Sequence, residues 1–181
     1  MYKARQFQAP EGAEVSGIIL MAYLNNLAHN ITEPILEQYG FDVSNIDVDQ
    51  WYPNQMFLDI EQTIYQNGDG SNALVAIGKA AVENYIPPKG VKTLEDAIMA
   101  LPSVYTTNQR NLPDGYGWII EKKAENHFVF TNNTGTSNHG AYGYVWALCQ
   151  RMRPLDAKVK VIPLKGFEAG SLEPTVIDIQ W

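Results

Sequence analysis

Apolar side chains recur three and four positions apart through much of the first hundred residues. This spacing places them on one face of a helix, so it predicts amphipathic helices packed on a common core. Pro34 suits the first turn of a helix, where its missing N–H needs no partner. Gly40 suits the left-handed end of the same helix. The predicted helices cover about residues 15–30, 34–39, 53–66, 71–85 and 94–101.

The last of these helices has a recognisable start and an ambiguous end. Thr93 is followed three residues later by Asp96, a variant of the capping box in which two side chains satisfy free backbone N–H groups. Pro102 lacks an N–H and either ends or kinks the helix. Residues 104–117 are predicted as a loop that ends in the turn Pro-Asp-Gly.

The final third of the chain changes pattern. GWIIEKKAENHFVFTN is extended and rich in aromatic residues, and the polar stretch TNNTGTSNH follows it. From Gly140 the spacing is helical again, and two strand-like runs, AKVKVIPL and PTVIDIQW, end the sequence. The order strand, polar loop, helix, strand, strand predicts a sheet with one helix laid across it. The apolar positions of that helix are Tyr142, Val145, Trp146, Cys149 and Met152.

These elements together predict an α+β fold. Its helical N-terminal two-thirds would pack on a small antiparallel sheet that is crossed by one C-terminal helix. Residues 1–13 are polar, contain Pro10 and Gly12, and are predicted to form a flexible lead-in. Residues 14–181 are predicted to form a single ligand-binding, sensor-like domain, because a chain of 181 residues fits one domain.

Composition and charge narrow the function classes. Hydrophobic residues make up 45% of the chain and charged residues 18%, so the apolar surplus can line a cavity or an interface. The net charge is −7, and the 13 Lys and Arg occur singly or in pairs, which argues against binding nucleic acid or an anionic membrane. No apolar run approaches the roughly 18 residues of a membrane span.

The reactive side chains give little support to catalysis or metal binding. The three histidines, His29, His127 and His139, show no recognised metal spacing, and no catalytic or metal residue is assigned. Cys149, the single cysteine, excludes an internal disulfide and lies on the apolar stripe of a predicted helix. The cysteine usage and the absence of an apolar signal core favour a cytoplasmic location.

The aromatic residues of the last third carry the most specific hypothesis. Phe128 and Phe130 alternate on a strand, so they share one face of the sheet. Tyr142, Trp146 and Cys149 would face them from the helix. An aromatic-rich core is one interpretation of these five residues, and an apolar pocket that binds a ligand is the other.

The layout also resembles a known superfamily. A helical N-terminal part, then FVFTNNT, then HGAYGYVWAL as a helix and two strands, is similar to the haem nitric-oxide/oxygen-binding (H-NOX) sensor domains. The superfamily includes 4-vinyl-reductase-type domains and TRAPP vesicle-tethering subunits. The resemblance covers residues 14–181 as an order of elements and is confined to about residues 128–152 at motif level. It implies an α+β fold that encloses a small hydrophobic ligand, often in a sensor or scaffold.

The same resemblance makes a family-type haem site unfavourable here. In the haem sensors a Tyr-x-Ser-x-Arg motif holds the propionates, and the corresponding positions of this chain are Phe130, Asn132 and Thr134. The helix that should carry the proximal histidine corresponds to residues 94–101, which contain no histidine. The cysteine cluster of many vinyl-reductase-type domains is also missing. The cofactor therefore stays unknown.

We predict a small-molecule-binding sensory or interaction module for a hydrophobic or aromatic ligand. The ligand would bias the packing of the helical part against the sheet and pass that change to a protein partner. One alternative is an enzyme for a small substrate with His127 or His139 as general base. Another is a homodimeric assembly protein without a ligand.

Overall fold

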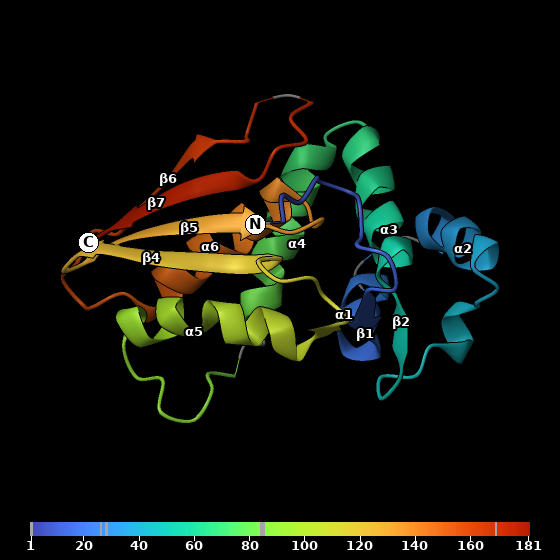
Figure 1. Ribbon diagram of the computed structural model, residues 1–181, viewed down its shortest axis with the longest axis horizontal. Helices are drawn as coiled ribbons and strands as arrows, with labels where there is room; N and C mark the ends of the chain where they lie inside the picture. Colours follow the sequence, from blue (N-terminus) through green and yellow to red (C-terminus); the bar gives the residue numbers. More distant parts are fainter. Residues whose placement is uncertain (1, 26, 28, 84–85, 169) are drawn as a thin grey trace.

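A computed structural model describes residues 2–25, 27, 29–83, 86–168 and 170–181. Figure 1 shows a helical part at one end of the molecule and a four-stranded sheet at the other. The first part contains β1 (Glu14–Ser16), α1 (Gly17–Leu24), α2 (His29–Gln38), the 3-10 turn η1 (Val43–Asn45), β2 (Trp51–Pro53), α3 (Asn54–Gln66) and α4 (Gly70–Glu83). The second contains α5 (Leu94–Thr107), β3 (Gln109–Arg110), β4 (Gly117–Ala124), β5 (His127–Asn133), α6 (Asn138–Met152), β6 (Lys160–Lys165) and β7 (Thr175–Gln180).

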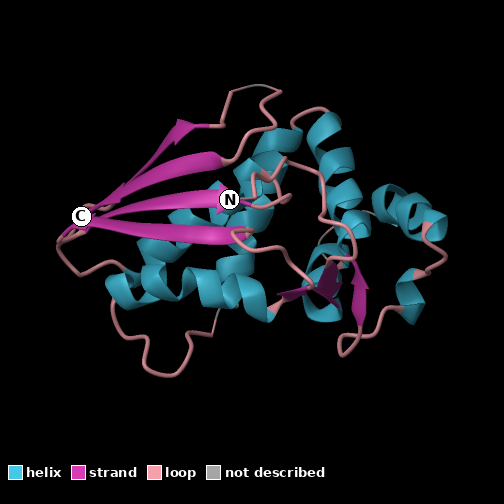
Figure 2. Cartoon of the chain, viewed as in Figure 1, coloured by secondary structure: helices cyan, strands magenta, loops and turns pink. Residues whose placement is uncertain are grey.

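The larger sheet is antiparallel throughout, with strand order β4-β5-β7-β6. Alternate residues of β5 and β7 point to the same face, where Phe128, Phe130 and Ile177 are fully buried. Val145 and Leu148 of α6 belong to the same buried core, so α6 covers this face of the sheet (Figure 2). The arrangement confirms the predicted α+β fold with one helix across an antiparallel sheet.

The helical part has its own apolar core. Leu20 of α1, Leu36 of α2, Met56 of α3 and Leu74 of α4 are fully buried within it. A three-stranded sheet with order β2-β1-β3 borders this core and was not predicted. Its strands are two or three residues long, which is too short to give a visible alternation of apolar and polar residues.

Helix α4 packs closely against α6 and joins the two parts of the molecule. A methyl group placed on Gly78 would meet the carbonyl oxygen of Gly140 at 2.1 Å. One placed on Gly143 would meet the carbonyl oxygen of Val75 at 2.2 Å. Both distances are shorter than any real carbon–oxygen contact, so glycine is required where these two helices touch.

Several predicted helix boundaries are wrong. The helix predicted over residues 15–30 begins as β1, and α1 ends at Leu24. Helix α2 begins at His29, so Pro34 lies inside it and not in its first turn. Helix α5 continues through Pro102 to Thr107, where a loop was predicted. Burial of Leu101 and Tyr105 on either side of the proline offsets the one lost backbone hydrogen bond.

The N-terminal segment, expected as a loose lead-in, is packed against the rest of the molecule. Ala4, Gln6 and Phe7 are buried. The segment begins beside the end of β5 and crosses to the helical part (Figure 1). Residues 2–9 are called the N-terminal segment below.

Among the described residues, no helix has both the length and the apolar character that are needed to cross a lipid bilayer.

Candidate functional site

The polar stretch from the end of β5 to the first residue of α6 is the most unusual feature of the interior. Residues 132–138, called the junction loop, lie where the helical part meets the sheet. Asn132, Thr134, Ser137 and Asn138 are at most 2% exposed, although loops of this composition normally face water. Buried polar groups require hydrogen-bond partners, so the partners of this loop show how the junction is built.

Two asparagines hold the junction loop together. The side chain of Asn132 accepts hydrogen bonds from Trp118 Nε1 at 3.1 Å and from the Thr134 hydroxyl at 2.7 Å. It donates to Asn138 Oδ1 at 3.2 Å. Asn138 in turn donates to the carbonyl oxygens of Gly166 and Glu173, both at 2.8 Å. The loop therefore ties β4, α6 and the β6–β7 connection to one another.

A buried carboxylate joins the junction loop to the helical part. Glu61 of α3 is 1% exposed. Its Oε2 accepts a hydrogen bond from the backbone N–H of Ser137 at 2.8 Å, and its Oε1 accepts one from the Tyr23 hydroxyl at 2.8 Å. Burial raises the pKa of Glu61 to about 7, and the two hydrogen bonds oppose that rise. Glu61 can therefore gain or lose a proton near neutral pH.

Sequence reasoning missed Glu61, although a signal was present. Glu61 lies four residues after Phe57 and three before Ile64, in the middle of the apolar face of α3. A carboxylate among buried apolar side chains is rare unless it has a specific partner.

An aromatic cluster lies beside the carboxylate. The ring centroid of Tyr105 on α5 is 5.2 Å from that of Trp118 and 6.4 Å from that of Tyr116. The Tyr116 hydroxyl accepts a hydrogen bond from the Gly135 N–H at 2.6 Å. The Tyr105 hydroxyl is shielded from solvent. It lies beside the Tyr116 and Thr134 side chains but makes no hydrogen bond of good geometry to a described residue. Burial raises the pKa of Tyr105, and the nearby Tyr116 and Glu61 add to the rise.

Three of the five predicted ligand-binding residues lie in one core. Phe128, Phe130 and Cys149 are fully buried together between α6 and the sheet. Burial raises the pKa of the Cys149 thiol to about 12, which keeps it protonated. The Trp118 and Phe130 rings are 5.6 Å apart, so the aromatic cluster around Tyr105 is continuous with this core.

Of the other two predicted residues, Tyr142 borders this core, whereas Trp146 is not among the described residues that pack against it. Tyr142 is half-buried and packs edge-on against Phe167 at 5.2 Å. Trp146 is also half-buried, and the Lys79 ammonium lies 4.3 Å from the centre of its ring. Whether these five residues bind a ligand stays a prediction.

The histidines proposed as general bases have separate surroundings. His127 Nε2 lies 2.7 Å from Asp178 Oδ1 across β5 and β7. His139 contacts the Phe167 ring at 4.4 Å, and burial lowers its pKa. His29 is the first residue of α2, and its side chain lies outside the described part of the structure. Within the described chain, no three His, Cys, Asp or Glu side chains gather as a metal site would require.

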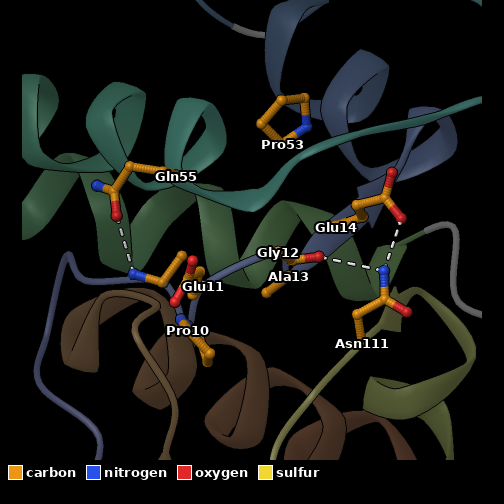
Figure 3. A pocket seen from close by; sticks show the side chains of 9 residues that line it. Pro10, Glu11, Gly12, Ala13, Glu14, Pro53, Gln55 and Asn111 are labelled. Carbon is orange, nitrogen blue, oxygen red and sulfur yellow. Dashed lines mark hydrogen bonds between the residues drawn. The ribbon is translucent and has the colours of Figure 1, made fainter.

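The surface carries an open pocket of about 520 Å³ that is lined by residues 9–14, by Pro53 and Gln55 near the start of α3, and by Asn111 after β3. Figure 3 shows Gln55 on one side of it and Glu14 with Asn111 on the other. Asn111 donates to Glu14 Oε2 at 2.9 Å and to the Gly12 carbonyl oxygen at 3.1 Å. These polar groups already satisfy one another, so the pocket does not by itself define a binding site.

Comparison with known proteins identifies the fold. No protein-family model matches the chain. No curated protein matches it either. Among solved structures, an H-NOX protein from S. oneidensis in the Fe(II)NO ligation state is 12% identical, with a TM-score of 0.59 over 91% of this chain and 98% of that chain. A Cs H-NOX mutant with 4-cyano-L-phenylalanine at site 5 is 10% identical, with a TM-score of 0.61 over 91% and 95%. A third structure, solved to probe the function of haem distortion in the H-NOX family, is 9% identical, with a TM-score of 0.60 over 91% and 92%.

The chain therefore has an H-NOX-like fold. The resemblance inferred from the sequence is confirmed at the level of the H-NOX architecture, and identities this low carry no information about activity.

The residues at the corresponding positions do not fit a haem of the H-NOX type. Asn132 and Thr134 stand where the motif would hold the propionates, and their side chains are hydrogen-bonded to each other inside the protein. The neighbouring charged group is the carboxylate of Glu61, which would repel a propionate. Helix α5 contains no histidine, and its buried tyrosine, Tyr105, is packed against Trp118.

Proposed function

We propose that this chain is a haem-independent sensory or interaction domain that binds a small hydrophobic or aromatic molecule between α5, α6 and the sheet. The observation that carries the proposal is the Tyr105 hydroxyl, which has no well-formed hydrogen bond inside the aromatic cluster that the structure describes. A buried hydroxyl with no hydrogen bond at all costs roughly 1–3 kcal/mol. A ligand with one polar group would give Tyr105 a better partner than the neighbouring Tyr116 and Thr134 side chains. Most ligand pockets combine an apolar lining with a few polar groups of this kind.

The position of Tyr105 supports a sensory role. It lies on α5, and its cluster touches both the sheet core, through Trp118 and Phe130, and the surroundings of Glu61. A molecule that binds beside Tyr105 would contact the inner face on which Phe128, Phe130 and Cys149 lie. Binding would favour one packing of the helical part on the sheet over another, which is how a ligand shifts a conformational equilibrium.

Two aromatic probes, p-cresol and indole, test this proposal. We expect each to raise the melting temperature of the purified protein at millimolar concentration, and calorimetric titration to give one site. Tyr105→Phe should weaken binding of p-cresol at least tenfold, because the variant lacks the hydroxyl that would pair with the hydroxyl of p-cresol. Tyr39→Phe is the matched control, since the Tyr39 hydroxyl is bonded to Asp59 in the helical part. The proposal would be contradicted if neither probe stabilised the folded protein. Equal binding of p-cresol by Tyr105→Phe and the parent chain would also contradict it.

A haem titration tests the haem-independent part separately. Hemin added to the protein should give only the broad spectrum of free haem. A sharp Soret band that saturates at one haem per chain would overturn this part of the proposal and leave the test with p-cresol unaffected.

As a second candidate, we propose self-association through the sheet face that α6 leaves uncovered. Ile162 and Leu164 of β6 and Ile119 of β4 are large exposed apolar side chains on alternate positions of these strands. Light scattering after size exclusion would give twice the chain mass if this face forms a homodimer. A monomer at all concentrations would exclude it. Both a protein partner and a cytoplasmic location stay predictions.

A further inference from the structure

The N-terminal segment is held by two side-chain amides in the same way. Asn133 accepts a hydrogen bond from the Ala4 N–H at 3.0 Å and donates to the Tyr2 carbonyl oxygen at 2.9 Å. Gln55 accepts one from the Ala9 N–H at 2.9 Å and donates to the Phe7 carbonyl oxygen at 3.1 Å. Each amide therefore pairs with the carbonyl of one residue and the N–H of the residue two positions later. This pairing imitates a neighbouring β-strand.

Backbone contacts also hold the segment between the two amides, and the surface on which residues 2–9 lie is called the groove below. The Gln6 N–H donates to the Leu172 carbonyl oxygen at 3.0 Å, and the Phe7 N–H donates to the Gly135 carbonyl oxygen at 2.6 Å. Contacts with main-chain atoms hold a peptide backbone whatever its side chains are, and pockets for particular side chains give specificity.

The groove also selects particular side chains. Gln6 is 4% exposed, and its Oε1 accepts a hydrogen bond from the Asn138 N–H at 2.7 Å while its Nε2 donates to the Ser171 carbonyl oxygen at 3.2 Å. Ala4 is fully buried against Tyr105 and Tyr116.

Phe7 is buried against Tyr65, with ring centroids 5.4 Å apart. It adopts a φ of 63°, a left-handed conformation that costs a bulky residue free energy. Lys3 and Arg5 point outward, and Lys3 forms an ion pair with Glu173. A basic segment with a turn at residues 5–8 and with buried Ala, Gln and Phe thus fills this groove on a chain of net charge −7.

We propose that this groove is a binding site for a basic peptide that makes a turn like that of residues 5–8, and that the N-terminal segment is its exchangeable occupant. The residues that form the groove are Asn133, Gly135, Asn138, Leu172, Gln55 and Tyr65. None of residues 2–9 is among the buried residues of the two large cores, so the segment can leave without breaking either core. A peptide with the same pattern then occupies the groove.

The experiment uses the full chain and an acetylated peptide of residues 2–10 that carries a fluorophore at its C terminus. Ala4→Glu places a charge in a fully buried position and should release the segment without altering the groove. We expect fluorescence anisotropy to show at least tenfold tighter peptide binding by this variant than by the parent chain. Gln8→Ala is the matched control, because Gln8 is exposed on the same segment; it should bind like the parent.

Two further variants identify the site. Adding Asn133→Ala to Ala4→Glu should weaken binding of the peptide at least tenfold. Replacing Gln6 of the peptide by alanine should weaken its binding to Ala4→Glu by a similar factor. The proposal would be overturned if a folded Ala4→Glu variant did not bind the peptide. Equal peptide binding by Ala4→Glu with and without Asn133→Ala would also overturn it.

Hydrogen exchange on the parent chain covers the case in which Ala4→Glu does not fold. The amides of Ala4, Phe7 and Ala9 should exchange at least tenfold faster than those in the middle of α6, because the segment opens on its own. Exchange of both sets at one common rate would show that the segment leaves only on global unfolding, which contradicts the proposal.

Discussion

Glu61 Oε2 accepts a hydrogen bond from the backbone N–H of Ser137 at 2.8 Å, and this contact joins α3 to the start of α6. The amide of Ser137 precedes the helix, where free N–H groups attract negative charge. The carboxylate is fully shielded from water, and its second oxygen bonds the Tyr23 hydroxyl. The charge of Glu61 also raises the pKa of two further titratable groups, Tyr105 and Tyr116. One protonatable group therefore lies between the two cores.

The first prediction concerns stability and pH. Because burial raises the pKa of Glu61 from an ordinary value near 4.5 to about 7, the folded protein keeps a proton that the unfolded chain loses between those values. The unfolded state then binds fewer protons, so the free energy of unfolding falls as pH rises from about 4.5 to 7. The loss attributable to Glu61 is about 3 kcal/mol over this window. Urea titrations from pH 5 to pH 8 measure it.

Glu61→Gln is the variant that isolates this effect. The amide keeps an oxygen for the Ser137 N–H and offers an N–H to the Tyr23 hydroxyl, so both contacts survive. We expect this variant to match the parent at pH 5 and to exceed its stability at pH 8. Glu121→Gln, at an exposed position on β4, should leave the slope unchanged. A parent chain and a Glu61→Gln variant with the same pH dependence would contradict the prediction.

The fold was predictable where one periodic pattern persists over several turns. The stripe on α6 and the alternation of Phe128 and Phe130 suffice to place the helix on the inner face of the sheet. The boundaries failed where burial outweighs local preference, as at Pro102, and where strands are as short as β1. Local sequence rules cannot detect such boundaries, because these boundaries depend on contacts between residues that are far apart in the sequence.

The candidate site was predictable only in part. The three buried residues Phe128, Phe130 and Cys149 follow from periodicity alone. The link between Glu61 and Ser137 joins residues 76 positions apart, and no local spacing indicates it. No local spacing indicates the contacts of the N-terminal segment either, since its polar residues find partners only in the folded chain.

A second prediction tests the start of α5. The Thr93 hydroxyl accepts a hydrogen bond from the Asp96 N–H at 3.1 Å, and Asp96 Oδ2 accepts one from the Thr93 N–H at 3.0 Å, which confirms the predicted capping box. Thr93→Ala should lower the free energy of unfolding by roughly 0.5–2 kcal/mol. Thr93→Ser keeps the hydroxyl, so its free energy of unfolding should fall much less. Equal losses for both variants in urea titration would argue against the cap.

A third prediction uses two glycines of α6 that have opposite surroundings. Gly143→Ala would force the new methyl group into the Val75 carbonyl, so α4 and α6 must separate. The expected loss of stability is roughly 1–3 kcal/mol or more. Gly140→Ala meets nothing closer than 3.6 Å and should stabilise the helix by about 0.5–1 kcal/mol. A loss at Gly140 equal to that at Gly143 would show that α4 does not touch α6 as described.

The last prediction concerns the single cysteine. Cys149 is fully buried, and burial raises the pKa of its thiol to about 12, so both access and ionisation oppose its reaction. We expect the native protein to react with 5,5′-dithiobis(2-nitrobenzoic acid) only as fast as it unfolds, and to release one equivalent of thiolate at once in urea. Phe130→Ala removes a large side chain from the same core and should speed the reaction by destabilising that core, whereas Glu121→Gln on the exposed surface should not. Rapid modification of the folded parent chain would mean that reagent reaches the space between α6 and the sheet without unfolding. Such a result would contradict the buried position of Cys149.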